Sequence, residues 1–342
     1  MSNKPFVSIL IPVRNEVRYI PRCLQAVADQ EYPSDRIEVL VADGMSEDGT
    51  YELLQDWTSQ TANRFVFQNP GKIVPTGMNI LIPKAKGEVL IRVDGHSVIS
   101  PDYVFRCVDH LQKDGVDGVG GPMRSIGADL ISRVTALAMS SKFGVGNSSF
   151  RTESGMTKLA DTVPFPAYTR AIIERVGLYD DELVRNQDDE YNYRIREAGG
   201  KILLAEDVRS EYYSRGSLNK LWKQYFQYGF WKVRVLQKHP RQMSLRQFVP
   251  LVFVLVLILT LILSFLVSWG WKALLTLLTA YLLANLSASF MIAAGQGIRK
   301  FLLLPIAFTI IHLSYGFGFL KGLFKFWNRW KDKKGQVPDW LP

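Results

Sequence analysis

The stretch "FVSILIPVRNE", Phe6–Glu16, decides the fold class. Its first eight residues form a short, apolar, partly β-branched run, which is typical of a strand buried in a parallel sheet. The residues that follow place Ile20, Leu24 and Val27 at helical spacing. A buried strand followed at once by a helix indicates a sheet built from strand–helix units.

Three further strands and two further helices repeat this alternation. The strands are expected at Ile37–Asp43, Arg64–Asn69 and Gly87–Asp94, and the helices at Gly49–Thr61 and Thr76–Ala85. This order predicts an α/β fold with a doubly wound, mostly parallel sheet, in which ligands bind beyond the carboxyl ends of the strands. The first strand is not followed by G-x-G-x-x-G, and G-x-x-x-x-G-K-[ST] is missing, so the usual dinucleotide and P-loop signatures do not apply.

Polar residues follow three of these strands, at Arg14–Glu16, Asp43–Asp48 and Asp94–His96. Asp43 ends a strand and opens the turn "DGMSEDGT". An Asx turn and a helix cap would explain the rest of that turn, but not a carboxylate on the strand end itself. A carboxylate at this place can accept a hydrogen bond from a base N–H or a ribose hydroxyl.

Asp94 and His96 flank Gly95 at another strand end. Side chains at i and i+2 of a strand point to the same face. Carboxylate and imidazole suit manganese or magnesium, and a cation held there could neutralise a nucleotide diphosphate that leaves. The alternative is an acid in a turn beside an exposed histidine.

A run of acids and amides opens the stretch "VRNQDDEYNYRIREAGGKI", Val184–Ile202, at Gln187, Asp188, Asp189 and Glu190. A helical pattern follows, and Gly199 and Gly200 end it. Acids in a first helical turn are explained by capping and by the helix dipole, which contribute about 0.5–2 kcal/mol. They are equally compatible with one carboxylate that removes a proton, and the local sequence leaves both readings open.

The second part of the chain has the composition of membrane helices. Three apolar segments cover residues 248–267, 273–294 and 301–320, and a helix needs about 20 apolar residues to span the hydrocarbon core. The third is the weakest of the three, because it contains Pro305 and His312. Cys23 and Cys107 give neither a disulfide framework nor a zinc spacing, and no secretory signal opens the sequence.

The net charge of +9 is concentrated on both sides of the apolar segments. Basic clusters that flank membrane segments favour the cytoplasmic face and anionic lipid, so no nucleic-acid partner is expected. Three crossings would nevertheless put the basic residues after the third segment on the far side, against the positive-inside rule. A re-entrant or interfacial third segment, or a miscounted crossing, would remove this conflict.

Taken in order, these motifs resemble glycosyltransferase family 2, whose members have the GT-A nucleotide-sugar fold. "VSILIPVRNE" resembles the opening strand of the family, and "VLVADGMSEDGT" its first aspartate segment. The resemblance implies that the donor nucleotide is bound by Pro12, Asn15, Glu16, Asp43, Lys72 and Asp94. "GEVLIRVDGH" resembles the strand that leads to the Asp-x-Asp metal motif, with His96 in place of the second aspartate. A divalent metal, manganese or magnesium, is therefore expected at Asp94 and His96.

"NQDDEYNYRIREAGG" resembles the Glu-Asp motif of the family, with Gln187 in place of its glutamate. This match implies that Asp188 is the general base, while Asp189 and Glu190 begin and charge the helix. "QYGFW" resembles the Gln-x-x-x-Trp element of membrane-bound members, which implies acceptor-side roles for Gln227 and Trp231. Phe230 replaces the arginine of processive enzymes, so processivity is not implied. Phrases such as "DTVPFPAYTR" resemble the succinoglycan-biosynthesis branch.

The resemblance implies an inverting hexosyltransferase that uses a UDP-sugar donor, UDP-glucose or a related hexose, for exopolysaccharide or cell-surface glycan synthesis. Its acceptor would be a lipid-linked sugar or a polysaccharide. Two other readings stay open: a polyprenyl-phosphate glycosyltransferase, and a non-catalytic membrane scaffold with a degenerate site.

We expect four regions in a multi-pass protein of the plasma or inner membrane. They are a cytoplasmic catalytic domain (1–215), amphipathic interfacial helices (216–246), a membrane domain (247–325) and a basic tail (326–342). Aromatic and basic residues interleave over Leu218–Lys238, as in helices that lie in the membrane interface. Core packing is expected to account for fewer than half of its aromatic rings.

Overall fold

The computed structural model describes residues 4–127, 129–146, 149–152, 155–214, 216–294 and 297–332. The described chain forms two compact units. Residues 4–124 and 155–212 belong to the first, and the remainder, up to Asp332, to the second. Most of the expected basic tail, including Lys333 and Lys334, lies outside the described residues. Residues 125–127, 129–146 and 149–152 group with the C-terminal helices, an arrangement that no sequence pattern predicts.

The strands are β1 (Val7–Val13), β2 (Ile37–Asp43), β3 (Arg64–Gln68), β4 (Val89–Arg92), β5 (Ser97–Ile99), β6 (Gly118–Gly120), β7 (Met123–Ile126), β8 (Lys158–Leu159), β9 (Ala167–Thr169), β10 (Ile202–Leu204) and β11 (Ser210–Tyr213).

The helices of the first unit are α1 (Ile20–Ala28), α2 (Thr50–Ser59), α3 (Val74–Leu81), α4 (Tyr103–Lys113), α8 (Arg170–Val176) and α9 (Gln187–Glu197), with short 3₁₀ turns at Ser34–Arg36 and Ile82–Lys84. Those of the second are α5 (Leu130–Met139), α6 (Lys142–Val145), α7 (Ser149–Thr152), α10 (Leu218–Lys238), α11 (Val249–Leu266), α12 (Gly270–Ala293) and α13 (Ile298–Lys325), with 3₁₀ turns at Pro240–Gln242 and Leu245–Gln247.

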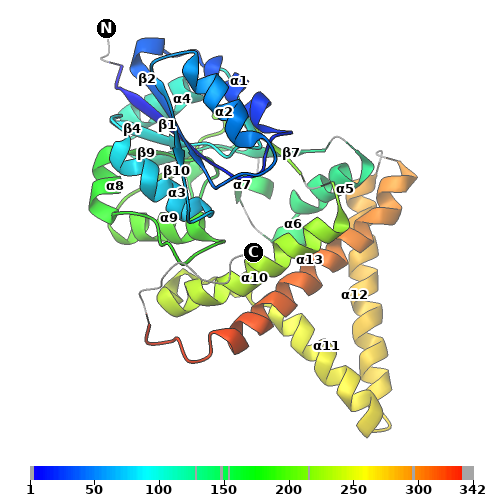
Figure 1. Cartoon of the computed structure of the whole chain (residues 1–342). Coiled ribbons are helices and arrows are strands. Elements are labelled where there is room, and N and C mark those ends of the chain that lie inside the picture. Colours follow the sequence, from blue (N-terminus) through cyan, green and yellow to red (C-terminus); the bar gives the residue numbers. More distant parts are fainter. Residues whose placement is uncertain are drawn as a thin grey trace. The chain divides into compact units, whose positions relative to one another are not determined.

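The first unit confirms the predicted α/β class (Figure 1). Its main sheet has the order β3-β2-β1-β4-β9-β6-β10-β8, and β8 and β9 run antiparallel to their neighbours. Every residue of β1 and β2 is buried, as the unbroken apolar runs predict. The remaining strands, β5, β11 and β7, form a second, small sheet.

The register of the central strands brings the candidate residues to one edge. Val13 pairs with Asp43 at the carboxyl ends of β1 and β2, and Leu10 pairs with Arg92 at the end of β4. The loops that follow these three strands therefore leave the sheet on the same side. This is the edge at which open α/β sheets bind ligands.

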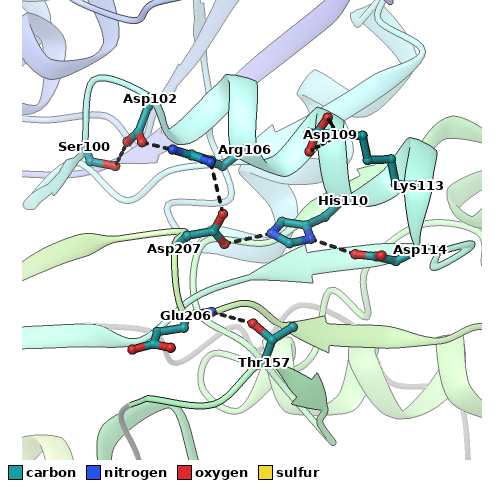
Figure 2. A network of polar contacts seen from close by, with 10 residues as sticks. All are labelled: Ser100, Asp102, Arg106, Asp109, His110, Lys113, Asp114, Thr157, Glu206 and Asp207. Atoms are coloured by element: carbon teal, nitrogen blue, oxygen red, sulfur yellow. Dashed lines mark hydrogen bonds and ion pairs between the residues drawn. The ribbon is translucent and has the colours of Figure 1, made fainter.

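A polar network fastens α4 to the loop before β11 (Figure 2). His110 Nδ1 lies 2.7 Å from Asp114 Oδ2, and His110 Nε2 lies 2.7 Å from Asp207 Oδ1. Arg106 reaches the other oxygen of Asp207 at 3.5 Å and donates to Asp102 at 3.1 Å. Burial lowers the pKa of His110, but the bonds to Asp114 and Asp207 outweigh burial, so the pKa is raised above its ordinary value. Each ring nitrogen of His110 therefore faces a carboxylate, which favours the protonated form of the ring.

His110→Gln is expected to destabilise the protein more at pH 5.5 than at pH 8.5. The pKa of His110 is higher in the folded protein than in the unfolded chain, where it is about 6.5. The stabilisation is therefore complete below the pKa of the unfolded chain and is lost as the pH rises through the pKa of the folded protein. Because both carboxylates are half-exposed, the difference should be on the order of 1 kcal/mol. Thermal unfolding at the two pH values measures it. Lys113→Gln, on the exposed side of the same helix, is the control, and an equal loss for His110→Gln at both pH values would contradict this assignment.

Among its described residues, the second unit has three helices long and apolar enough to cross a membrane, α11, α12 and α13. They correspond to the three expected segments. Inside this unit α10 packs along α13, and glycines permit the close approach (Figure 1). A Cβ on Gly229 would lie 2.1 Å from the carbonyl oxygen of Tyr315, and one on Gly318 would lie 2.0 Å from that of Phe226. Side chains at these two positions would push the helices apart.

Core packing explains more of α10 than its sequence suggests. Tyr225, Phe230 and Trp231 are buried, which is three of its six large aromatic rings, so the expectation of fewer than half was wrong. Arg234 is also fully buried. Its guanidinium donates to Gln237 Oε1 at 2.6 Å and to the carbonyl oxygen of Arg329 at 3.2 Å. Partners on both sides make burial of this cation possible.

Candidate active site

The loops after β1 and β2 interlock through hydrogen bonds from backbone N–H groups to side-chain oxygens. The backbone N–H of Asn15 donates to Ser46 Oγ at 2.9 Å, and that of Glu47 donates to Asn15 Oδ1 at 2.9 Å. Asn15 and Met45 both have left-handed backbones, at φ 55° and φ 57°. Asn adopts this conformation more readily than most residues, so Asn15 shapes the loop that faces the predicted donor site.

Asp43 is a buried carboxylate at the end of β2 with one oxygen open to a ligand. Its side chain is 1% exposed, and Oδ2 accepts from the N–H of Ser46 at 2.9 Å. Within the described part of the chain, Oδ1 is buried without a hydrogen-bond partner. An unsatisfied buried acceptor is costly, and an N–H or O–H of a ligand would satisfy it.

The other predicted donor residues differ in exposure. Pro12 is buried in β1, and a Cβ on Gly77 of α3 would lie 3.3 Å from its Cβ, so Pro12 belongs to the packing beneath the site. Lys72 is exposed and has a left-handed backbone at φ 61°, in the loop that leads into α3. Glu16 lies close to His96, with 3.1 Å between Glu16 Oε1 and His96 Nδ1.

Asp94 and His96 lie in a turn, not on a strand. β4 ends at Arg92, and the N–H of Ser97 donates to the carbonyl oxygen of Asp94 at 3.0 Å. The strand alternation expected for the two side chains is therefore wrong. A Cβ on Gly95 would lie 2.8 Å from Val13 Cγ2, so the turn is pressed against the end of β1 and needs glycine there.

The donor atoms of this turn fit a divalent cation that a ligand helps to coordinate. Arg92 donates to Asp94 Oδ1 through Nε at 3.0 Å and Nη2 at 2.8 Å, which leaves Oδ2 for another partner. Glu16 faces Nδ1 of His96, which leaves Nε2. The described residues include no group of three His, Cys, Asp or Glu side chains that could hold a metal alone. Two protein ligands with diphosphate oxygens and water are a common arrangement for magnesium and manganese.

The acids at the start of α9 have separate environments. The helix begins at Gln187, after Asn186 with a left-handed backbone at φ 63°, and Gln187 is buried. Glu190 is 2% exposed and accepts from Arg194 Nε at 2.6 Å and Nη2 at 3.1 Å. Arg194 also donates to the carbonyl oxygen of Val176 at 3.0 Å. Glu190 therefore acts inside the fold, by fixing α9 to the end of α8. Asp189 lies in the same first turn, where an acid suits the helix dipole.

Asp188 faces the sheet edge. Its carboxylate forms an ion pair with Nη1 of Arg92, and its side chain remains 41% exposed. An exposed carboxylate fixed by a buried guanidinium is accessible to a substrate and held in one orientation. Asp188 thus shares a partner, Arg92, with Asp94.

Arg92 is the residue that the sequence analysis missed. Only 4% of it is exposed, and its guanidinium binds both Asp94 and Asp188. It thereby joins the β4–β5 turn to the first turn of α9, two segments far apart in the sequence. The available signal was a charged residue inside the otherwise apolar run "VLIRV", because a buried charge must be paired.

Gln227 and Trp231, predicted for the acceptor side, lie on α10 in the second unit. Trp231 is 3% exposed, and its ring centroid lies 5.7 Å from that of Phe326. Its packing in this unit accounts for its burial. Gln227 is partly exposed. Acceptor roles for the two residues remain predictions.

The sequence of this chain is similar to those of known glycosyltransferases and glycan-biosynthesis proteins. The sequence model described as Glycosyl transferase family 2 matches residues 8–180. Succinoglycan biosynthesis protein ExoA of Rhizobium meliloti (strain 1021) is 29% identical over 330 residues, which cover 94% of this chain and 96% of the relative. A dolichyl N-acetyl-alpha-D-glucosaminyl phosphate 3-beta-D-2,3-diacetamido-2,3-dideoxy-beta-D-glucuronosyltransferase of Methanococcus voltae is 26% identical over 94% of this chain and 98% of the relative.

Among solved structures, the mannosyltransferase PcManGT from Pyrobaculum calidifontis, in complex with GDP-Man and Mn²⁺, is similar with a TM-score of 0.59. The match covers 95% of this chain and 88% of the other, at 18% identity. At this identity the likeness concerns the fold, and it agrees with the predicted GT-A architecture.

Proposed function

Because this chain belongs to glycosyl transferase family 2, we propose that it moves a hexose from a UDP-sugar to a lipid-linked or polysaccharide acceptor at the cytoplasmic face of a membrane. UDP-glucose or a related UDP-hexose is the proposed donor, and exopolysaccharide or cell-surface glycan synthesis is the proposed process. The observation that carries the proposal is the shared guanidinium of Arg92, which holds Asp94 and Asp188 together at the carboxyl edge of the sheet.

Each side chain has a distinct part in the proposed inverting displacement. The open oxygen of Asp43 accepts a hydrogen bond from the donor nucleoside. The acceptor hydroxyl oxygen bonds to C1 of the sugar as the bond from C1 to the diphosphate oxygen breaks, and Asp188 takes the hydroxyl proton. Arg92 orients Asp188 toward the acceptor. A divalent cation at Asp94 and His96 would neutralise charge on the departing diphosphate.

The names of two relatives support the acceptor class. One relative is named for succinoglycan biosynthesis and the other for transfer to a dolichyl-linked sugar phosphate. These names, together with the three apolar helices of this chain, suit an enzyme that meets a lipid-linked glycan. We also propose a catalytic domain at 1–215, interfacial helices at 216–246, a membrane domain at 247–325 and a basic tail at 326–342.

A donor screen tests the proposal. The purified full-length chain is incubated with UDP-glucose, UDP-galactose and other nucleotide sugars, together with membrane lipid extracts, with and without manganese. Metal-dependent transfer of a hexose to the lipid fraction is expected. Absence of both transfer and donor hydrolysis with every donor would favour a non-catalytic scaffold.

His96→Asp is expected to retain activity and to shift the metal preference toward magnesium. The change replaces an imidazole nitrogen with a harder oxygen ligand, and magnesium prefers oxygen. The ratio of rates with magnesium and manganese measures the shift. His96→Ala is the control, since it removes the ligand without replacing it. A His96→Asp protein that is inactive with every ion would show that His96 is not a metal ligand.

A further inference from the structure

The three apolar helices of the second unit have different surroundings. Over their most apolar windows, 17% of α11 and 11% of α12 is buried inside the protein, compared with 39% of α13. We propose that only α11 and α12 cross the membrane and that they do so as a hairpin. α13 then lies beside α10 on the membrane surface from which α11 enters and to which α12 returns. This inference rests on the membrane association proposed above, and not on the reaction.

α13 meets the hairpin at its open end. A Cβ on Gly316 would lie 2.4 Å from the carbonyl oxygen of Pro250, in the first turn of α11. Asn285, in the second half of α12, donates to the carbonyl oxygen of Pro305 at 3.1 Å. The turn that joins α11 to α12, around Trp269, is at the opposite end of the hairpin. α13 thus crosses the base of the hairpin, which extends away from it in Figure 1.

The C-terminal half of α13 is covered by a charged helix. Gly318 and Gly322 lie against the backbone of α10. That helix carries five cations, at Lys220, Lys223, Lys232, Arg234 and Lys238. A Lys or Arg at the centre of a bilayer costs about 2.5–3.5 kcal/mol on the insertion scale. Lys220 and Lys223 are exposed, whereas Lys232, Arg234 and Lys238 are buried inside the protein. The two exposed cations keep the beginning of α10 out of the hydrocarbon, and α13, which packs along α10, stays at the same level.

The middle of α13 is held by another segment that does not span a membrane. His312 Nε2 lies 2.8 Å from the carbonyl oxygen of Phe143, in the one-turn helix α6. The ring of Phe143 lies edge-on to that of Phe308, with 5.0 Å between centroids. A helix as short as α6 cannot cross a bilayer. The other ring nitrogen of His312, Nδ1, lies 3.0 Å from the hydroxyl oxygen of Tyr281 on α12. The polar side chain within the third apolar segment therefore joins α13 both to a one-turn helix and to the hairpin.

Charge gives an independent argument for two crossings. Basic residues precede α11, and further ones follow α12 at Arg299, Lys300, Lys321, Lys325, Arg329 and Lys331. The hairpin turn carries Lys272 alone, beside Trp269 and Trp271. Two crossings put both basic groups on one side and the tryptophans at the opposite interface, as the positive-inside rule and the aromatic belt require. Three crossings would leave Arg299 and Lys300 on the side of the first group and put Lys321, Lys325, Arg329 and Lys331 on the other side.

The exposed side chains of α13 suit contact with lipid. Leu302 and Ile306, one turn apart, are 61% and 46% exposed, and Phe324 is 72% exposed. The opposite stripe, which includes Leu304, Phe308 and Phe319, is buried. Such a helix, which also has cations at both ends, can lie in the headgroup region of a membrane. Its exposed apolar face then contacts the upper part of the acyl chains.

Cysteine accessibility in oriented membrane vesicles tests the placement. The native Cys23 and Cys107 are buried, so the wild-type chain supplies the unlabelled control. Gln55→Cys marks the first unit, Lys272→Cys the hairpin turn and Asn328→Cys the region after α13, and all three positions are exposed. A membrane-impermeant maleimide should label Gln55→Cys and Asn328→Cys in one vesicle orientation, and Lys272→Cys only in the other.

Two results would overturn the placement. Labelling of Asn328→Cys together with Lys272→Cys would make α13 a third crossing. Labelling of all three positions from one side would exclude a crossing hairpin and membrane insertion with it. Hexose transfer, measured in the same variants, reports separately on the proposed reaction. Spin labels give a second measure: a label at Leu259, in the middle of α11, should lie deep in the bilayer, and one at Ile306 should lie near the headgroups.

Discussion

Asp188→Asn is expected to lower the rate of sugar transfer by about 10²–10⁴-fold, the usual contribution of a general base. Asparagine keeps the size of the side chain and can still accept a hydrogen bond from Arg92, but it cannot take the proton of an acceptor hydroxyl. Binding of the UDP-sugar should be retained, because Asp43 and the β4–β5 turn are unchanged. Steady-state transfer kinetics and calorimetry with UDP and manganese measure the two quantities.

Asp189→Asn is the matched control, with the same chemical change one residue further on. Its expected role is charge in the first turn of α9, which is worth about 0.3–1 kcal/mol. A larger loss in Asp189→Asn than in Asp188→Asn would put the base one residue later than we propose. Full transfer by Asp188→Asn would instead favour a lipid phosphate as the acceptor, since a phosphate oxygen needs no base.

The fold of the first unit was accessible from sequence because local signals and burial agree there. β1 and β2 are apolar throughout and are buried throughout, and the helix after each has one apolar face. α9 also ends as expected, before Gly199, where the backbone turns left-handed at φ 82°, whereas it begins at Gln187, two residues before the expected Asp189. At such places a pattern of a few residues is sufficient to define the element.

The candidate site was only partly accessible, because its key contact joins segments that are distant in the chain. Asp94 and Asp188 were identified one by one from motifs, but their common partner Arg92 has no motif of its own. The run that contains Arg92 reads as an ordinary buried strand. Which carboxylate neutralises a buried guanidinium depends on the strand order and on where α9 docks, and neither can be read from a short window.

The packing of the second unit was hidden for a related reason. Hydropathy measures how well a helix suits lipid, but it does not say whether protein covers the helix instead. α11 and α13 are both long and apolar enough to span a membrane, although a larger share of α13 is buried inside the protein. The glycines that seat α13 against α10, Gly318 and Gly322, become meaningful only once the partner helix is known.

Arg92→Met is expected to reduce kcat by about 10²-fold or more, the loss that a displacement of about 1 Å can cause in an active site. The change removes the cation between Asp94 and Asp188, so two neighbouring carboxylates repel each other and Asp188 loses its fixed orientation. Asp94 keeps its carboxylate, so affinity for UDP with manganese should be largely retained. The predicted result is therefore a loss in kcat with little change in donor affinity, measured by transfer kinetics and calorimetry.

Arg92→Lys separates positioning from simple support of the fold. Lysine restores the positive charge, but its single ammonium group cannot make the forked contacts by which the guanidinium reaches two carboxylates. Part of the lost kcat should return, and the thermal midpoint of unfolding should recover further than kcat does. Stability depends on neutralising two partly buried carboxylates, which a lysine charge can do, whereas kcat depends on orienting them, which requires the planar guanidinium. If both variants lose donor affinity and stability in proportion to kcat, Arg92 serves the fold alone. If Arg92→Met transfers sugar at the wild-type rate, Asp188 does not depend on Arg92 for its orientation.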